Sequence, residues 1–385
     1  INWKGDLEQV DDVLIIGGGV IGLSLARELH RLGAGPIAVV ERGKVGREAS
    51  FAAAGMLAPN AENEIIDDFY RLCDGSRSMF PIFADELRAE TEIDIELDRT
   101  GTLYAAFSEA DSHHLDLRFS RQIAAGIPVT RLSAKETLAM EPRLSASVRE
   151  SLYFPNDWQV ENRKLLAALE KYARGNGIEI VDETSVDELV VEGTRAIGVA
   201  TGERKLFSQV TVLATGAWTS LIKMGNVRVP LTVRPIRGQM VSFGPLERIL
   251  RHVIYSPRGY LVPRADGRIL AGATVEDVGF DCSVTVNAAN ELKLNACEIA
   301  SDLTDIDVAE NWAGLRPFAA DGSPIIGPMP GMDGLFVATA HYRNGILLAP
   351  MTAKILAERI INKTDSLYFK LFGPERFLNK LNANA

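Results

Sequence analysis

The feature that most constrains how this chain folds is a glycine-rich stretch at residues 17–22, which reads GGGVIG and has the spacing G-x-G-x-x-G. The short apolar run 13–16 before it is typical of a buried parallel strand, and apolar residues at helical spacing follow it. A second buried strand is predicted at 37–40, and Glu41 closes it about 20 residues after the last glycine. Strand, glycine turn and helix in this order predict a dinucleotide-binding βαβ unit.

Each glycine of the stretch has a physical reason to be glycine. Gly17 would permit the tight turn, Gly19 would let the backbone approach a pyrophosphate, and Gly22 would allow close packing of helix on strand. The first N–H groups of the helix would then point at the phosphates. Glu41 would accept hydrogen bonds from ribose hydroxyls, and its charge argues against a 2′-phosphate there. The alternative is a glycine-rich turn in an ordinary α/β protein.

The rest of the chain alternates short β-branched runs with amphipathic helical stretches, which is typical of an α/β architecture. Between residues 229 and 275 the pattern changes to short strands with turn signals, which favours an antiparallel sheet. We therefore expect a discontinuous dinucleotide-binding domain, an inserted substrate-binding domain and a C-terminal tail. The predicted bounds are 8–88, 151–228 and 312–365 for the first, 89–150 and 229–311 for the second, and 366–385 for the tail.

Composition excludes several classes of protein. The chain has 46% hydrophobic and 24% charged residues, which argues against a disordered or fibrous protein. Its net charge of −10 disfavours nucleic acid and anionic membrane surfaces as partners. No apolar run reaches the ~18 residues that a membrane-spanning helix needs. The three cysteines are odd in number and widely spaced, which favours a reducing cytoplasm, and neither they nor the five histidines have metal-ligand spacing.

The segment 47–59, REASFAAAGMLAP, follows the second predicted strand and bears on the choice between flavin and nicotinamide. Its small residues would let a bulky ring lie against the backbone, and Ser50 would donate to a phosphate. A small-residue helix packed on the sheet would have the same composition, so this segment alone leaves the cofactor open.

The order of motifs along the whole chain resembles that of the D-amino-acid oxidase-like FAD-dependent oxidoreductases, in particular the glycine oxidases of thiamine biosynthesis. The motifs are VLIIGGGVIG, Glu41-Arg42, SFAAAGMLAP, VLATGAW, RGYLVPR, WAGLRP, DGSPIIGP and AHYRNGILLAP, and they span residues 12 to 362. The resemblance implies an FAD-binding Rossmann-like (p-hydroxybenzoate-hydroxylase-like) domain with an inserted antiparallel-sheet substrate domain. It also implies FAD as cofactor and the oxidation of small amino acids to imines.

The resemblance assigns contacts with an extended FAD to residues of the motifs that follow the strands of the first domain. They are Gly17, Gly19, Val20, Ile21, Gly22, Glu41, Arg42, Ala49, Ser50, Ala54, Gly55, Met56, Val186, Gly216, His341, Tyr342, Arg343, Asn344, Gly345, Ile346 and Leu347. Ala49 stands where the family commonly has a hydroxyl, which leaves one phosphate contact without its donor. Covalent relatives attach flavin through a cysteine just beyond the Arg-Pro, where this chain has Phe318 and Ala319, so we expect non-covalent FAD.

Three residues are predicted to hold the substrate, and no general base is expected. Arg316 is a planar guanidinium suited to a bidentate carboxylate, and the alternative is a structural salt bridge. Tyr260 would add a phenolic donor, unless it is a core aromatic residue. The resemblance places Arg343 near the substrate, whereas a loop arginine is often a solvated charge. His341 is expected to be a loop residue positioned by the backbone rather than a base.

Three functions stay open from the sequence. The first is an oxidase of glycine, sarcosine or D-alanine that reduces dioxygen to hydrogen peroxide and yields the oxo acid (glyoxylate from glycine) and ammonia, with a role in thiamine thiazole synthesis. The second is a D-amino-acid dehydrogenase that passes electrons to a quinone, and the third is a non-catalytic FAD-binding subunit. Relatives are often tetramers, so a homo-oligomer is a further expectation.

Overall fold

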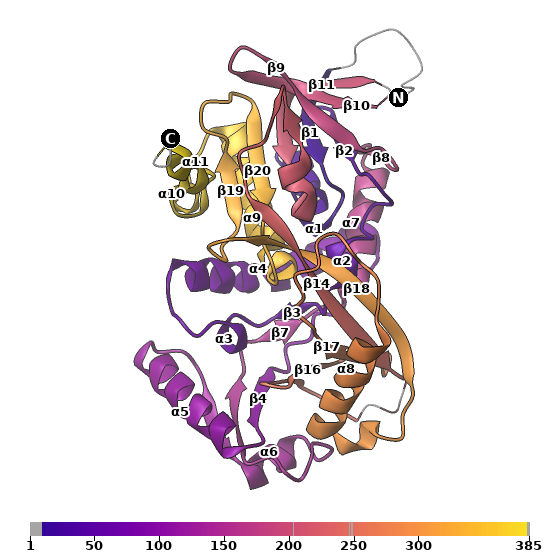
Figure 1. Ribbon diagram of the computed structural model, residues 1–385, viewed down its shortest axis with the longest axis vertical. Coiled ribbons are helices and arrows are strands. Elements are labelled where there is room, and N and C mark those ends of the chain that lie inside the picture. The colour runs from indigo at the N-terminus through magenta and orange to yellow at the C-terminus, as the bar shows by residue number, and fades with distance from the viewer. Residues whose placement is uncertain (1–9, 203, 246, 248, 383–385) are drawn as a thin grey trace.

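The computed structural model describes residues 10–202, 204–245, 247 and 249–382. Two β-sheets lie one beyond the other along the long axis of the molecule (Figure 1). Residues 8 and 9 of the predicted first domain and residues 383–385 of the predicted tail lie outside the described residues.

The first sheet has ten strands and is built around a parallel core. Strand β1 lies between β11 and β2, parallel to both, and β2 and β11 have β8 and β20 as further parallel neighbours. The strands are β1 (Val10–Ile16), β2 (Ile37–Val40), β8 (Glu179–Val181), β9 (Val186–Glu192), β10 (Arg195–Thr201), β11 (Lys205–Leu213), β12 (Lys223–Met224), β13 (Val227–Arg228), β19 (Ile325–Pro328) and β20 (Leu335–Thr339). Because parallel strands end at one edge, the loops after β1, β2, β11 and β20 meet there.

Four helices pack on one face of this sheet: α1 (Val20–Arg31), α4 (Asp68–Thr91), α7 (Asn162–Gly175) and α9 (Gly345–Asn362). The apolar side of α1 is fully buried in the core between α7 and α9. Arg27 of α1 is also buried, and its guanidinium donates to Glu86 at 2.9 Å and to Glu90 at 2.7 and 2.8 Å, both on α4. This paired charge joins α1, the helix that follows the glycine turn, to α4.

The second sheet has eight strands and is covered by α5 (Glu109–Ala124), α6 (Ala134–Met140) and α8 (Val286–Ile299). Its strands are, in spatial order, β18 (Val308–Ala319), β14 (Val233–Phe243), β17 (Ile269–Gly272), β16 (Gly259–Pro263), β15 (Val253–Ser256), β4 (Thr102–Ala106), β6 (Glu150–Phe154) and β5 (Thr130–Ser133). All neighbours are antiparallel except β15 and β4, which run parallel.

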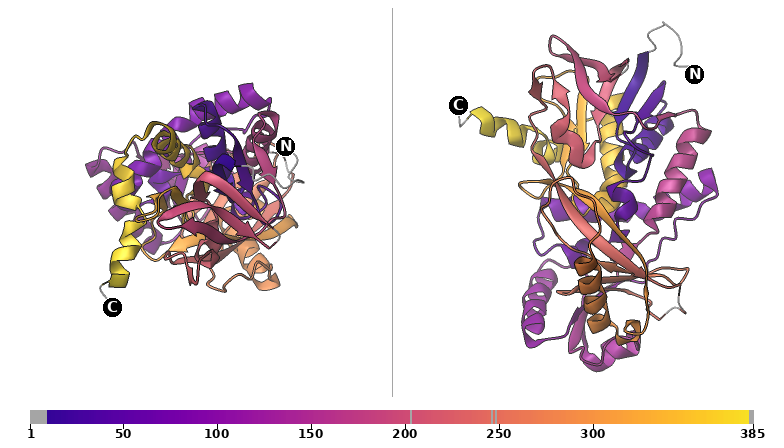
Figure 2. Two further views of the ribbon diagram at one scale, coloured as in Figure 1. Left: turned by 90° about the horizontal axis from the view of Figure 1, so that it is seen from above. Right: turned by 45° about the vertical axis from the view of Figure 1, so that its right-hand side comes forward.

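The long antiparallel pair β14 and β18 joins the two halves of the molecule. It runs from the base of the first sheet to the outer side of the second, as both side views show (Figures 1 and 2). Residues 238 and 314 lie opposite each other in the middle of this pair. Short elements fill the space between the sheets: α2 (Ala49–Ala52), β3 (Met56–Leu57), α3 (Pro59–Glu62), β7 (Trp158–Gln159) and a 3₁₀ helix at Gly216–Leu221.

The predicted fold class is confirmed, with one parallel pair in the inserted sheet that the sequence pattern did not indicate. The strand predicted at 37–40 has those bounds, and α9 begins inside the last of the quoted motifs, AHYRNGILLAP. The domain bounds stay a prediction, but β6 and β18 pair within the second sheet although most of their residues were assigned to the first domain. The tail forms α10 (Leu367–Phe372), against β19, and α11 (Glu375–Asn382).

Two expected absences concern the described residues only. No helix among them is both long and apolar enough to cross a membrane. Nor does this part of the chain bring together three or more His, Cys, Asp or Glu side chains in a way that would hold a metal ion.

Candidate active site

A cavity of about 1440 Å³ begins at the carboxyl ends of the parallel strands and extends between the two sheets. Gly17, Glu41 and Val186 line its end at the first sheet, and Tyr260 and Arg316 line its end at the second. Ligands of open α/β sheets bind at this carboxyl edge, so the cavity lies where the βαβ unit predicts a dinucleotide.

The glycine turn between β1 and α1 is shaped as the sequence predicts. Gly17 has φ 111°, and a Cβ there would lie 2.3 Å from the carbonyl oxygen of Ala214 at the end of β11. A Cβ on Gly22 would lie 2.0 Å from the carbonyl oxygen of Gly17. Gly19 is the N-cap of α1 and makes no side-chain cap, so this helix terminus has the open geometry that suits a phosphate.

Side chains that follow β2 brace this turn. The Glu41 carboxylate accepts hydrogen bonds from the N–H groups of Gly18 at 2.8 Å and Gly43 at 3.0 Å. Ser50 Oγ accepts one from the N–H of Val20 at 3.2 Å. Glu41 and Ser50 line the cavity, and their oxygens can form further hydrogen bonds. The predicted contacts of Glu41 with a ribose and of Ser50 with a phosphate are therefore compatible with these hydrogen bonds.

The small-residue segment forms a wall of the cavity rather than an interior helix. Ala49, Ser50, Ala54, Gly55 and Met56 all line it. The segment is held from behind by side chains whose role was not predicted: Arg264 donates to the carbonyl of Ala54 at 2.8 Å, and Asn162 donates to those of Ser50 and Phe51 at 2.9 and 3.1 Å. Burial lowers the pKa of Arg264 to about 10, which leaves it charged near neutral pH.

Arg316 lies on β18 at the far end of the cavity and packs flat on Gly238 of β14. A Cβ on Gly238 would lie 2.2 Å from Cζ and from both terminal nitrogens of the guanidinium. Nη1 donates to the carbonyl of Thr274 at 3.0 Å. Within the described part of the chain, no carboxylate lies within ion-pair distance of Arg316, so the alternative of a structural salt bridge is not what the structure shows.

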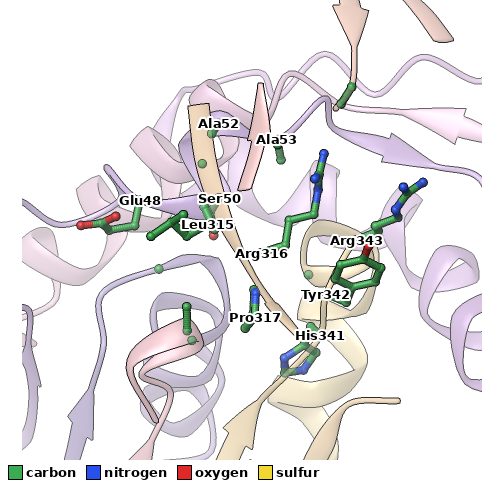
Figure 3. Close-up of a pocket in the computed structure, with 18 of the residues that line it drawn as sticks. Glu48, Ser50, Ala52, Ala53, Leu315, Arg316, Pro317, His341, Tyr342 and Arg343 are labelled. Atoms are coloured by element: carbon green, nitrogen blue, oxygen red, sulfur yellow. The ribbon is translucent and has the colours of Figure 1, made fainter. Parts of the chain in front are cut away.

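Arg343 is the second cation of this end of the cavity. Its guanidinium and that of Arg316 extend in the same direction from neighbouring elements (Figure 3). Arg343 likewise forms no ion pair with any described carboxylate, and both guanidiniums act electrostatically on the buried Tyr260 hydroxyl. Burial raises the pKa of Tyr260, so the phenol stays a hydrogen-bond donor. Two guanidiniums and a phenol that line one end of a cavity are groups that can bind a small carboxylate.

The loop 340–345 turns the chain from β20 into α9. Ala340 and Tyr342 have φ of 58° and 48°, which are uncommon for residues with side chains and occur where surrounding structure enforces them. Asn344 caps α9 without a side-chain hydrogen bond, and Gly345 and Ile346 line the cavity. The positive end of α9 therefore favours negative charge in the cavity.

His341 is not placed to act as a base. Its ring is buried, Nε2 lies 3.1 Å from Thr352 Oγ1, and burial lowers its pKa to about 3. The imidazole is therefore neutral at physiological pH, with one nitrogen engaged, in agreement with its predicted structural role.

Of the predicted site residues, three do not line the cavity: Gly22, Asn344 and Leu347. Gly22 acts through packing against Gly17, and Leu347 is a core residue of α9. Sequence analysis missed Tyr255 and Glu62, which line the cavity near the two arginines. Glu62 lies a few residues after the SFAAAGMLAP motif. A single carboxylate with no motif around it gives no signal in the sequence that it faces a binding site.

The geometry fits FAD: a glycine cradle that a Cβ would fill, an open helix N-terminus, small residues along one wall, and a cavity of about 1440 Å³ that is lined from Glu41 at one end to Arg316 at the other. Residues 12–359 match the family model of the FAD-dependent oxidoreductases. The chain is 34% identical to a glycine oxidase of Pseudomonas aeruginosa, over 90% of this chain and 93% of that protein. It is 33% identical to the bifunctional protein ThiO/ThiG of Synechocystis sp., over 98% of this chain and 55% of that protein.

A solved structure agrees with these matches. The glycine oxidase of Geobacillus kaustophilus superposes with a TM-score of 0.88 at 33% identity, covering 94% of this chain and 97% of that one. The match in sequence, the shared fold and the dinucleotide cavity lead to one conclusion: the chain belongs to the FAD-dependent oxidoreductases, among the relatives of glycine oxidase.

Proposed function

We propose that the protein oxidises glycine and other small amino acids, such as sarcosine and D-alanine, to imines that water hydrolyses to the oxo acid and ammonia (methylamine in the case of sarcosine), with dioxygen reduced to hydrogen peroxide. The observation that carries this proposal is the pair of guanidiniums, Arg316 and Arg343, that face the cavity without a carboxylate partner among the described residues. Arg316 is half-buried and Arg343 is exposed, and a substrate carboxylate would supply a counter-charge to both guanidiniums.

FAD would supply the two-electron acceptor for this oxidation. The residues suited to hold its pyrophosphate are the N–H groups at the start of α1 and Ser50, and Glu41 with Val186 lies at the adenosine end of the cavity. Binding without a covalent bond follows from Phe318 and Ala319, which stand where covalently flavinylated relatives have a cysteine.

The chain's own contribution to the reaction is to bind and orient the amino acid. Arg316 is braced against Gly238 and Thr274, so its remaining N–H groups point to a fixed place in the cavity. Tyr260 and Arg343 add further donors at the same end of the cavity. A carboxylate held by several fixed donors restricts the orientation of its neighbouring carbon, which is how such sites turn binding into rate.

A steady-state panel of amino acids under air tests the proposed function. We expect one hydrogen peroxide and one ammonia for each glycine consumed, together with glyoxylate. Reduction of an artificial dye in the absence of air, with no peroxide under air, would instead indicate a dehydrogenase that uses a quinone. Flavin that is not reduced by glycine, sarcosine or D-alanine without air would indicate a binding subunit and would overturn the proposal.

The likeness to the ThiO/ThiG protein supports a narrower proposal, that the imine formed from glycine is used in thiamine thiazole synthesis. Complementation of a strain that lacks its own glycine-oxidising enzyme of this route, with growth scored in the absence of thiamine, tests this point. If the protein is fully active in the peroxide assay but does not restore growth without thiamine, this narrower proposal is wrong.

The variant Gly238→Ala tests whether the place of the Arg316 guanidinium matters. The new methyl group would overlap the end of a flexible side chain, which can move, so the fold should survive while the guanidinium leaves its position. We expect KM for glycine to rise about 10- to 100-fold, equal to ~1.4–2.7 kcal/mol, because a charged hydrogen bond loses its geometry. Steady-state kinetics at saturating dioxygen measures this KM, and a thermal melt of the variant shows whether the fold is intact. An unchanged KM would show that the substrate does not use this guanidinium.

A further inference from the structure

Glu62, at the end of the short helix α3, presents a carboxylate to the substrate end of the cavity. The residue is half-buried and lines the cavity, and its carboxylate makes no hydrogen bond or ion pair with any described residue. The groups that lower its pKa electrostatically are Arg343 and Arg316, the two cations proposed to bind the substrate carboxylate. Glu62 is thus a negative group that faces the same space as the two guanidiniums without neutralising either at close range.

The backbone that carries Glu62 is held in place by a buried network. The Asp157 carboxylate accepts hydrogen bonds from the N–H groups of Asn60 and Ala61 at 3.1 and 2.7 Å. Arg118 and Gln122 donate to the carbonyl of Asn60 at 3.1 and 2.7 Å. Such a braced turn keeps the neighbouring Glu62 in one position before any ligand arrives.

The other carboxylates that line the cavity are engaged or lie elsewhere. Glu41 is bonded to the glycine turn, Glu48 pairs with Arg42, and Glu276 is bonded to Arg237 at 2.6 Å. Asp187 lies at the adenosine end, beside Val186, and Glu291 is exposed on α8. In the described part of the chain, Glu62 is therefore the carboxylate available to a ligand bound between Arg316 and Arg343.

An amino acid arrives as a zwitterion, and this creates a conflict at a site with two cations. The guanidiniums attract the carboxylate but repel the ammonium only two bonds away, and at short range in a protein such repulsion is worth several-fold in affinity or more. The amine must also lose a proton before its α-carbon can give up a hydride, since the electron pair on nitrogen forms the new C=N bond.

We propose that Glu62 binds the ammonium group of the substrate and accepts a proton from it, leaving a neutral amine next to the bound carboxylate. The proposal rests on the proposed function, which defines the substrate. In this step one N–H bond breaks and one O–H bond forms on the Glu62 carboxylate, with no change in oxidation state. The proton leaves to solvent through the open cavity after the product departs.

The surroundings of Glu62 suit a proton acceptor that works near neutral pH. Burial raises the pKa of its carboxyl to about 7, against the lowering effect of the Arg343 and Arg316 guanidiniums. The other groups that interact with it are the Tyr255 and Tyr260 hydroxyls and the Cys73 thiol. Burial raises the pKa of all three, so they stay protonated and neutral while Glu62 titrates.

The variant Glu62→Gln tests whether Glu62 binds the substrate ammonium group or has only a structural role. An ammonium site predicts weaker binding of glycine but not of acetate. Binding of glycine and of acetate to the FAD-loaded protein, reduced and kept without air so that glycine is not consumed, is measured by calorimetry. We expect glycine to bind about 10- to 100-fold more weakly to the variant, because a charged hydrogen bond is lost. Acetate, which has no ammonium, should bind as tightly or more tightly, because a repelling negative charge is gone.

The control variant is Glu109→Gln, an exposed carboxylate in the first turn of α5 that does not line the cavity. It should change neither binding constant. Equal weakening of glycine and acetate in Glu62→Gln, or no change in either, would overturn the ammonium site. Wild-type protein that neither binds nor oxidises glycine would overturn the proposed function together with this inference, whereas normal wild-type behaviour with an unaffected variant overturns the inference alone.

The pH profile supplies a second readout. With Glu62 as proton acceptor, kcat/KM for glycine should fall on the acidic side of a pKa near 7 in the wild type. In Glu62→Gln the decrease of kcat/KM at acidic pH should disappear, and the pH-independent value of kcat/KM should be lower than in the wild type. Persistence of the same decrease in the variant would show that another group titrates, and would count against the proton transfer.

Discussion

Replacement of Arg316 by alanine is expected to raise the dissociation constant of the amino acid about 30- to 1000-fold while the protein keeps its FAD. The range corresponds to ~2–4 kcal/mol, the loss of a charged and geometrically fixed hydrogen-bond pair in a partly desolvated site. Arg316 lies on β18, at the end of the cavity away from the glycine turn, and its hydrogen bonds with the described residues go to the carbonyls of Arg237 and Thr274, outside the dinucleotide end. In this variant, substrate binding should therefore weaken while FAD binding stays unchanged.

The control is Arg234→Ala, an arginine on the partner strand β14 that pairs with Asp277 at 2.7 Å and does not line the cavity. It removes the same positive charge from the same pair of strands and should leave KM within about twofold of the wild type, as surface substitutions usually do. Addition of free guanidinium should partly restore amino-acid binding to the Arg316→Ala variant and should not change KM of the control variant. Loss of flavin with unchanged substrate kinetics would contradict the assignment of Arg316.

The dinucleotide half of the site was predictable from sequence because its constraints are local. A Cβ on Gly22 would meet the carbonyl oxygen of Gly17, five residues before it; Gly17 has φ 111°, a conformation that favours glycine; and Glu41 follows the next strand. The regular spacing of strand, turn and helix then places them without knowledge of the rest of the chain.

Residues that reach the site through long-range packing were missed. Glu62 faces the cavity because Asp157, far away in sequence, bonds the turn before it. The helix Asp68–Thr91 was not predicted because Gly75 and Pro81 interrupt its pattern, although its contacts with α9 and α7 stabilise it. The position of Arg316 over Gly238 depends on the register of two neighbouring strands, β14 and β18, between which β15, β16, β17 and α8 lie in the sequence. Local periodicity carries no information on such pairings.

A second large effect is expected at the other end of the cavity, from Gly22→Ala. Position 22 lies inside α1, where alanine is favoured over glycine by about 1 kcal/mol, so the helix itself should gain stability. The new methyl group would nevertheless lie 2.0 Å from the carbonyl oxygen of Gly17 and 3.2 Å from Ile15 Cγ2. Because the first contact is with backbone, no rotation of a side chain relieves it. The turn must move away from the helix by more than 1 Å, and the N–H groups that would face the pyrophosphate move with it.

The expected result is protein that folds but is purified with little or no FAD, and whose affinity for added FAD is lower by about 100-fold or more, since misplacement of this order at a preorganised site costs that much. Visible flavin absorbance relative to protein absorbance, followed by titration of FAD into the apoprotein with circular dichroism as a fold control, measures both. The matched variant is Gly175→Ala, near the end of α7, where a methyl group meets nothing within 4 Å. If Gly22→Ala retains FAD as the matched variant does, close packing of α1 on the turn is not what positions the phosphate-binding groups. If it loses FAD while its helix content is normal, the glycine serves the position of the turn rather than the stability of the helix.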